Sequence, residues 1–211
     1  YTRLLKEFGA GWTRKTTIAR FGTIEATKVI EATEKLYFDR EGGFAGTGLK
    51  NAEFVAECSL LDEMIVIFRN GTYRISKIEE KKFIGRGEVL YINRFRRNDN
   101  RPIYNVIYRQ GKRGPWLIKR CSITGISRDK DYNLISDEEG SRITYFSANP
   151  NGEAETVRIA LKPQPRMRVL TFEKSFSEVP IRGRGAKGNL VTRAEVQRIT
   201  LKQRGASTLG G

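Results

Sequence analysis

The chain has 211 residues, 38% of them hydrophobic, and its 39 Lys and Arg against 24 Asp and Glu give a formal net charge of +15, with no histidine. This length can bury a core in one domain, or in one domain plus an appendage. The lack of histidine excludes the commonest general base and metal ligand, and no apolar run approaches the roughly 20 residues that cross a bilayer. Cys58 and Cys121 lie far apart without metal-ligand spacing, which predicts reduced thiols in a cytosolic protein.

The first segment is expected to be helical. Leu4, Leu5 and Phe8 have helical spacing and are followed by Gly9 and Gly11, a pattern typical of a helix that ends at glycine. Residues 12–33 carry few signals, and the stretch 23–32 fits either a short helix or a strand. We expect the sequence to be a piece of a longer protein, with residues 1–33 as a separate N-terminal segment.

From residue 34 onward the pattern changes to strands and turns. Turns are predicted at Gly42-Gly43, at Asn70-Gly71, around residues 111–114 and at residues 150–152, each between two strand-like runs. Asn-Gly is the strongest of these signals, because a type I′ hairpin turn needs positive φ at both central residues. Further strand-like runs cover residues 167–172 and 188–201.

The turns at residues 71, 111 and 152 recur every 40 or 41 residues. Such a period favours blades, as in a propeller or a related fold. A barrel or sandwich of hairpins fits the spacing equally well. The run Met64 to Phe68 is apolar throughout and predicts a strand buried on both faces, whereas residues 157–161 alternate, with Arg158 facing away from Val157 and Ile159.

The basic charge is unevenly distributed. Residues 94–130 hold 11 basic and 2 acidic residues, residues 181–211 hold 7 and 1, and residues 131–160 between them hold 2 and 6. Two positive segments separated by an acidic one predict a basic tract on a folded surface, with a polyanion such as nucleic acid as its partner. The alternative is a solvated basic surface that has no partner.

Two basic clusters are candidate phosphate contacts. The first lies in a loop-like stretch and consists of Arg94, Arg96, Arg97 and Arg101; the second surrounds Trp116 and consists of Lys112, Arg113, Lys119 and Arg120. Arg and Lys on loops can bind phosphates without reading bases. We interpret Trp116 as a packing residue rather than a base-stacking platform.

The stretch "IRGRGAKGNLVTR", residues 181–193, combines three glycines with four basic residues and no acid. The glycines at 183, 185 and 188 would let the backbone approach an anion closely, and Arg182, Arg184, Lys187 and Arg193 supply charge. A loop of this kind between strands predicts a contact with a phosphate backbone. Alone it is a weak signal, since such turns are common in basic proteins.

No catalytic motif is visible. The sequence has no Ser/His/Asp set, no Walker loop and no dinucleotide-binding fingerprint, and its paired acids are typical of solvated loop charges. We therefore expect this chain to be non-catalytic, with no cofactor or metal of its own.

Several phrases resemble the C-terminal DNA-binding region of the A subunit of bacterial type IIA topoisomerases, gyrase and topoisomerase IV. "LLKEFGAGWTRKTTI" is similar to the end of the family's coiled coil, and "DEMIVIFRNGTYRISKI" to its repeated "dD.i.l.T..G..y.ik" phrase. "GRGAKGNLVT" resembles the gyrase box, Q-R-R-G-G-K-G. "YFSANPNGEAE" and "GASTLGG" are most similar to topoisomerase IV A subunits of the Bacteroidetes type.

The resemblance implies an all-β fold, a β-pinwheel of about four blades over residues 34–211, preceded by a short helical segment that ends a coiled coil within residues 1–33. It implies duplex DNA as the partner, bound and bent without base readout. It also implies an upstream catalytic core that forms the A-subunit dimer, a B subunit that uses ATP and Mg²⁺, and a cytoplasmic, nucleoid-associated location.

Departures from the gyrase box favour topoisomerase IV over gyrase. Gly183 stands where the box has its second basic residue, Ala186 replaces a glycine, and the match lies late in the chain, whereas gyrase carries its box in the first blade. Two alternatives stay open: a gyrase-type domain with a divergent box that wraps DNA, and an RNA-binding or ribosome-associated β module.

Overall fold

The computed structural model describes residues 2–8, 34–59, 61–125, 127–165 and 167–209. The chain divides into two units, Tyr1–Glu31 and Ala32–Gly211. In the first unit, helix α1 spans Thr2–Phe8. The expectations for residues 12–33 lie outside the described residues, and the assignment of residues 1–33 to the end of a coiled coil stays a prediction. No helix in the described part of the chain is long and apolar enough to cross a membrane.

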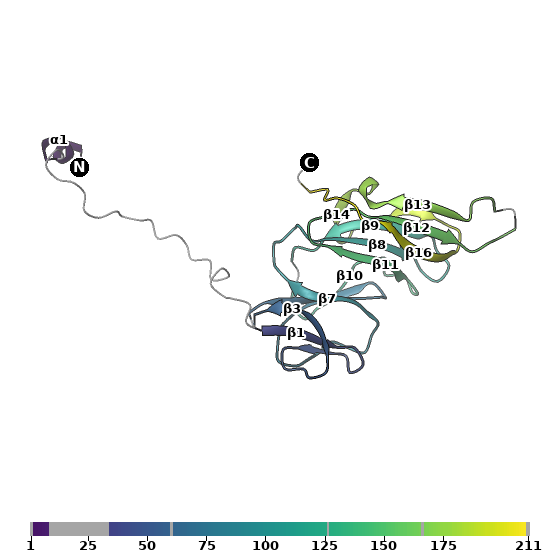
Figure 1. Ribbon diagram of the computed structural model, residues 1–211, viewed down its shortest axis with the longest axis horizontal. Helices are drawn as coiled ribbons and strands as arrows, with labels where there is room; N and C mark the ends of the chain where they lie inside the picture. The colour runs from purple at the N-terminus through teal and green to yellow at the C-terminus, as the bar shows by residue number, and fades with distance from the viewer. Residues whose placement is uncertain (1, 9–33, 60, 126, 166, 210–211) are drawn as a thin grey trace. The chain divides into compact units, whose positions relative to one another are not determined.

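The described residues of the second unit form four β-sheets, which we call blades 1 to 4 (Figure 1). Blade 1 has the strand order β3 (Glu53–Cys58), β1 (Glu34–Asp39), β2 (Phe44–Gly46), β6 (Lys82–Phe83). Blade 2 has the order β10 (Asp131–Asn133), β5 (Thr72–Lys77), β4 (Glu63–Phe68), β7 (Val89–Phe95). Blade 3 contains β11 (Arg142–Asn149), β8 (Ile103–Arg109) and β9 (Trp116–Ser122), with both β14 (Ile181–Gly183) and β15 (Asn189–Thr192) on the edge of β9. Blade 4 has the order β13 (Thr171–Ser175), β12 (Thr156–Leu161), β16 (Val196–Gln203), and the short helix η1 (Phe176–Glu178) follows β13.

Neighbouring blades exchange strands. After the hairpin β4–β5 of blade 2, the chain returns to blade 1 as β6 and then rejoins blade 2 as β7. The same path recurs after the hairpin β8–β9, with β10 in blade 2 and β11 in blade 3. It recurs again after β12–β13, with β14 and β15 in blade 3 and β16 in blade 4. The 40-residue step between the hairpin turns at residues 71 and 111 therefore spans β5, the exchanged β6, the returning β7 and β8.

Three predicted turns form hairpins within a blade. They join β1 to β2, β4 to β5 and β8 to β9. The type I′ assignment at Asn70-Gly71 was wrong, because φ is positive at Gly71 (88°) and not at Asn70. Instead, the Gly71 N–H donates to the Phe68 carbonyl (2.9 Å), and Gly71 takes the left-handed conformation that closes a three-residue hairpin loop.

The predicted hairpin at residues 150–152 was also wrong. A turn is present there, since the Gly152 N–H donates to the Asn149 carbonyl (3.2 Å), but its flanking strands do not pair. β11 pairs with β8 in blade 3, whereas β12 pairs with β13 and β16 in blade 4. This turn is a connection between blades.

The core consists of three apolar clusters, each filled by side chains from two consecutive blades. Alternate residues of β4 enter different clusters: Ile65 and Ile67 pack with blade 3, while Met64, Val66 and Phe68 pack with blade 1. This confirms the prediction of a strand buried on both faces. Blades 3 and 4 share the third cluster, in which Trp116 is buried, as its interpretation as a packing residue requires. Both cysteines are buried and free.

Candidate nucleic-acid interface

The loop of residues 184–188 is built around a buried lysine of β9. β14 runs parallel to the last residues of β9 and β15 runs antiparallel to its first ones, so the loop projects from one sheet edge. Beneath it, the Lys119 ammonium donates to the carbonyls of Arg184 (2.7 Å) and Ala186 (2.9 Å). It also donates to the carbonyl of Leu134 (2.7 Å), the residue that directly follows β10 of blade 2. These bonds fix the loop and connect it to blade 2.

Lys119 and Arg120 correct the sequence-based prediction. They were predicted as surface phosphate contacts, but they are 4% and 2% exposed. Arg120 points to the opposite face of β9 and donates to Asn105 Oδ1 (3.0 Å) and the Gly152 carbonyl (2.9 Å). Because these hydrogen-bond donors bind groups inside the protein, neither residue is a candidate DNA contact. Because β9 is buried on both faces, its charged side chains face neighbouring blades and not solvent.

Arg184 is only half-exposed and also connects two blades. Its guanidinium carbon lies 4.7 Å from the ring centroid of Tyr132 in blade 2, and its Nη1 donates to the Tyr73 hydroxyl (3.0 Å). Tyr73 is fully buried. The loop is therefore a connector between blades 2 and 3 as well as a source of surface charge.

The remaining cations of the loop region face solvent. Arg182 and Lys187 are exposed and line one small crevice of about 10 Å³ together with Gly188, so the structure brings them together. Arg193 is exposed between β15 and β16, at the other end of β9, because Thr192 pairs with Trp116. None of these three forms an ion pair with a described residue.

The cluster 94–101 is mostly paired with acids. Arg94 lies 3.6 Å from Asp62, and Arg101 lies 3.1 Å from Asp99. Arg97 donates to both carboxylate oxygens of Glu63 (2.8 and 3.0 Å). Only Arg96 of this predicted set is exposed and has no ion pair within the part of the chain that the structure describes.

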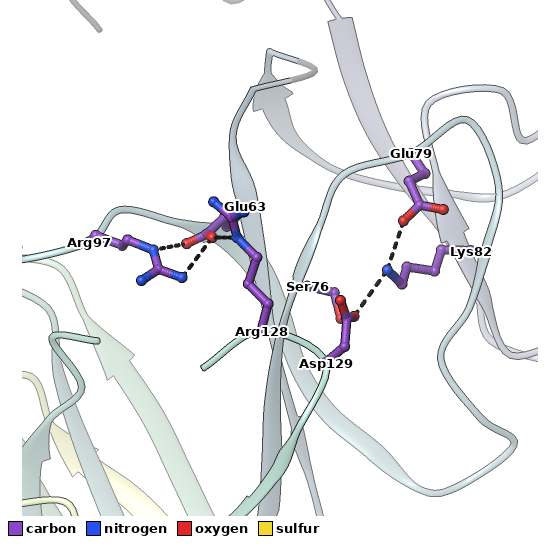
Figure 2. Close-up of polar contacts among 7 residues, drawn as sticks. All are labelled: Glu63, Ser76, Glu79, Lys82, Arg97, Arg128 and Asp129. Carbon is purple, nitrogen blue, oxygen red and sulfur yellow. Dashed lines mark hydrogen bonds and ion pairs between the residues drawn. The ribbon is translucent and has the colours of Figure 1, made fainter. Parts of the chain in front are cut away.

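Glu63 joins two loops that connect blades 2 and 3. Its carboxylate is 5% exposed and accepts from Arg97, which follows β7, and from Arg128, which precedes β10 (Figure 2). Burial acts to raise the pKa of Glu63, but the hydrogen bonds from both arginines outweigh it and hold the pKa below its ordinary value of 4.5. Ionised Glu63 therefore connects the two loops at this end of the blades.

The predicted contacts divide between the two ends of blade 3. The loop 96–101 and Arg182 lie at the end where β8 begins and β9 finishes, while Lys112, Arg113 and Arg193 lie at the other end. The seven residues of β8 separate these ends by about 20 Å. At the far end Lys112 pairs with Glu139, whereas Arg113 is exposed and has no ion pair with a described residue.

Sequence reasoning missed two further exposed lysines, Lys81 and Lys130. Each lies directly before an exchanged strand, β6 or β10, and rests against an aromatic ring rather than an acid. The sequence does place a lysine before each of these strands. Strands of two and three residues show no periodic pattern, however, so the sequence does not reveal where they lie. No group of three or more Cys, Asp or Glu able to hold a metal ion occurs among the described residues.

Four blades that exchange strands in this way define a β-pinwheel. The fold is similar to that of a solved structure, the crystal structure of the C-terminal domain of DNA topoisomerase IV, with a TM-score of 0.55 and 10% identity over 81% of this chain and 61% of that one. The chain belongs to the family described as the topoisomerase C-terminal domain of Bacteroidota, whose sequence profile matches residues 35–204. It is also similar to the A subunit of DNA topoisomerase 4 from Borreliella burgdorferi, with 29% identity over 147 residues. That match covers 70% of this chain and 23% of the relative.

Proposed function

We propose that this chain binds duplex DNA without reading its sequence and bends it, as the C-terminal part of the A subunit of a topoisomerase IV. The observation that carries the proposal is a set of exposed cations without ion pairs to described residues on a β-pinwheel of this family: Arg96, Arg113, Arg182, Lys187 and Arg193. A net charge of +15 adds a long-range attraction for polyanions.

The proposed place of the chain is beside a catalytic core that lies outside it. There the pinwheel would present DNA segments to the cleavage and religation site for ATP-dependent decatenation and relaxation. The A-subunit dimer, the use of ATP and Mg²⁺, and the B subunit belong to that larger assembly, and we propose a cytoplasmic, nucleoid-associated location. The chain alone should neither cleave nor relax supercoiled plasmid.

The test is fluorescence anisotropy with several unrelated duplexes over a range of salt concentrations. Contacts with ~5 phosphates predict similar affinities for all duplexes and a slope of log K against log salt of about −4.5. Single-stranded DNA and duplex RNA of the same length serve as comparison ligands. A flat salt response would contradict the proposal, and tighter binding of RNA or single strands would favour an RNA-binding module.

A divergent gyrase-type domain is the other candidate, and the loop 184–188 is the observation that favours it. A loop of this type that wraps DNA would give a large chiral linking change when nicked plasmid is sealed on the protein. The loop lies on blade 3 and uses Arg184 internally, so we expect bending with little linking change. A large positive linking change per bound protein would support the gyrase-type function instead.

A further inference from the structure

An exposed lysine precedes each exchanged strand that pairs antiparallel with the edge of a blade. Lys81 lies directly before β6, Lys130 directly before β10, and Lys187 two residues before β15. These strands end blades 1, 2 and 3, each pairing antiparallel with the second strand of the blade's hairpin. The first residues of these strands pair with Ala45, Arg74 and Ile118. The three lysines therefore lie on the same edge of three consecutive blades, each before the strand start and on the side away from the hairpin turn.

The three segments that carry these lysines are residues 79–82, 129–132 and 184–188, and each contacts the next. The Lys82 ammonium lies 3.0 Å from Asp129, which joins the first turn to the second (Figure 2). The ring of Tyr132 joins the second turn to the third, because Lys130 and Arg184 both lie over it, at 5.9 and 4.7 Å from its centroid. The three turns form one continuous strip across the three blades.

Three of the four acids on this strip contact a cation. Lys82 pairs with Glu79 and Asp129, and Arg74 pairs with Asp131. Glu80 is the only acid of these turns without a cationic partner among the described residues.

The three lysines, in contrast, are exposed and are not held by acids of the strip. Lys81, Lys130 and Lys187 form no ion pair with a described residue, and two of them rest on rings, since the Lys81 Nζ lies 4.4 Å from the ring centroid of Phe44. The strip thus presents, on each of the three blades, one ammonium group that forms no ion pair with a described residue.

We infer that Lys81, Lys130 and Lys187 form a row that follows the sugar-phosphate backbone of duplex DNA, one phosphate contact per blade. The inference rests on the proposed function and specifies where the DNA lies. A compact ammonium on a flexible stem suits a contact that adapts to any sequence. Repetition at one place in each blade suits a ligand that repeats along its own axis, as a phosphate backbone does.

The test compares two triple variants that remove the same charge. The row variant is Lys81→Ala, Lys130→Ala, Lys187→Ala. The control variant is Arg86→Ala, Arg168→Ala, Arg198→Ala, whose residues are exposed, form no ion pair with described residues and lie toward the hairpin-turn ends of blades 1 and 4. Losing three phosphate contacts should reduce the magnitude of the salt slope by about 2.7 in the row variant and leave it unchanged in the control. Affinity for duplex DNA should fall about tenfold in the row variant alone.

Further variants keep the result interpretable. Each single Lys→Ala change in the row should reduce the slope by about 0.9. The triple Lys→Arg variant retains the charge and should bind like wild type. Circular dichroism checks that every variant is folded. Equal losses in the row and control variants would overturn the row while leaving DNA binding intact. Absence of DNA binding by the wild-type chain would instead overturn the proposed function.

Discussion

The guanidinium of Arg184 lies over the ring of Tyr132, 4.7 Å from its centroid, and thereby joins the loop 184–188 of blade 3 to blade 2. The same guanidinium donates to the buried hydroxyl of Tyr73. Arg182 stands two residues earlier, exposed and without an ion pair to a described residue. Two arginines of one short basic stretch therefore have different roles, and their substitutions should be separable.

We expect Arg184→Ala to lower the free energy of unfolding and Arg182→Ala to leave it unchanged. Removal of Arg184 leaves the hydroxyl of Tyr73 without its donor, and an unsatisfied buried polar group costs about 1–3 kcal/mol. Arg182→Ala should stay within about 0.5 kcal/mol of wild type. Urea denaturation followed by tryptophan fluorescence measures both. Equal midpoints for the two variants would contradict the role of Arg184 as a connector.

Lys119→Met tests whether the buried ammonium holds the loop 184–188. Methionine fills a similar volume but donates no hydrogen bond, so three carbonyls lose their partner. We expect unfolding to require about 2–4 kcal/mol less, and we expect protease to cleave near Arg184 and Lys187 faster than in wild type.

Lys112→Met is the matched control for that experiment. Lys112 is an exposed lysine that pairs with Glu139 on the surface, and surface pairs contribute little to stability. Its variant should unfold within about 0.5 kcal/mol of wild type. If Lys119→Met were as stable as this control, the ammonium would not be the group that fixes the loop.

The sequence predicted hairpins well and strand exchange poorly. Glycines with positive φ, Gly43, Gly71 and Gly111, mark three of the hairpin turns, and the strands beside them show a pattern. The connection between β12 and β13, residues 162–170, contains no glycine and was not predicted as a turn. The exchanged strands β6, β10 and β14 have two or three residues each. Their place is set by contacts with a blade formed tens of residues earlier, so no local signal distinguishes them from loops.

The candidate site was predicted in part for a similar reason. A basic residue in a loop and one within a strand look alike in a charge count. Lys119 and Arg120 directly follow Leu117 and Ile118 in a strand buried on both faces, and this apolar context was the available sign of burial. The ion pairs of Arg97 and Arg128 with Glu63 join residues 34 and 65 positions apart, which sequence proximity does not reveal.

Glu63→Gln should reduce stability in a pH-dependent manner. The folded-state pKa of Glu63 is below 4.5, so its contribution is present above about pH 4.5 and is lost as the pH falls through the lowered folded-state value. Glutamine cannot form the ionic contacts with Arg97 and Arg128. At pH 7 we expect the variant to be about 1–2 kcal/mol less stable, because both arginines are half-exposed and regain water.

The measurement is urea denaturation of wild type and variant from pH 7 to pH 3. The stability difference should shrink as the pH falls below about 4.5, because protonated Glu63 loses the same contacts in wild type. Glu57→Gln is the control, since Glu57 is exposed and has no ion pair with a described residue. It should stay within about 0.5 kcal/mol of wild type at pH 7. A Glu63→Gln difference that is constant with pH would mean that packing, and not charge, explains its effect.

The glycines of the loop region should respond to alanine in opposite ways. A Cβ at Gly188 would lie 2.7 Å from the Ile118 carbonyl oxygen, so the backbone would have to shift, and we expect a loss of about 1–3 kcal/mol. A Cβ at Gly183 or Gly185 would meet nothing within 4 Å, and neither residue has a left-handed φ. Of these three positions, the fold therefore needs glycine at 188 only.

The double variant Gly183→Ala, Gly185→Ala should separate folding from DNA binding. If a phosphate approaches the main chain at these two positions, two methyl groups there would keep it away. The variant should then unfold like wild type, within about 0.5 kcal/mol, and bind duplex DNA about tenfold more weakly, a loss of roughly 1.4 kcal/mol. Urea denaturation and anisotropy titration on the same preparations measure both quantities. Wild-type affinity in the double variant would show that these two glycines do not serve DNA binding and that Arg182 and Lys187 act through their side chains alone.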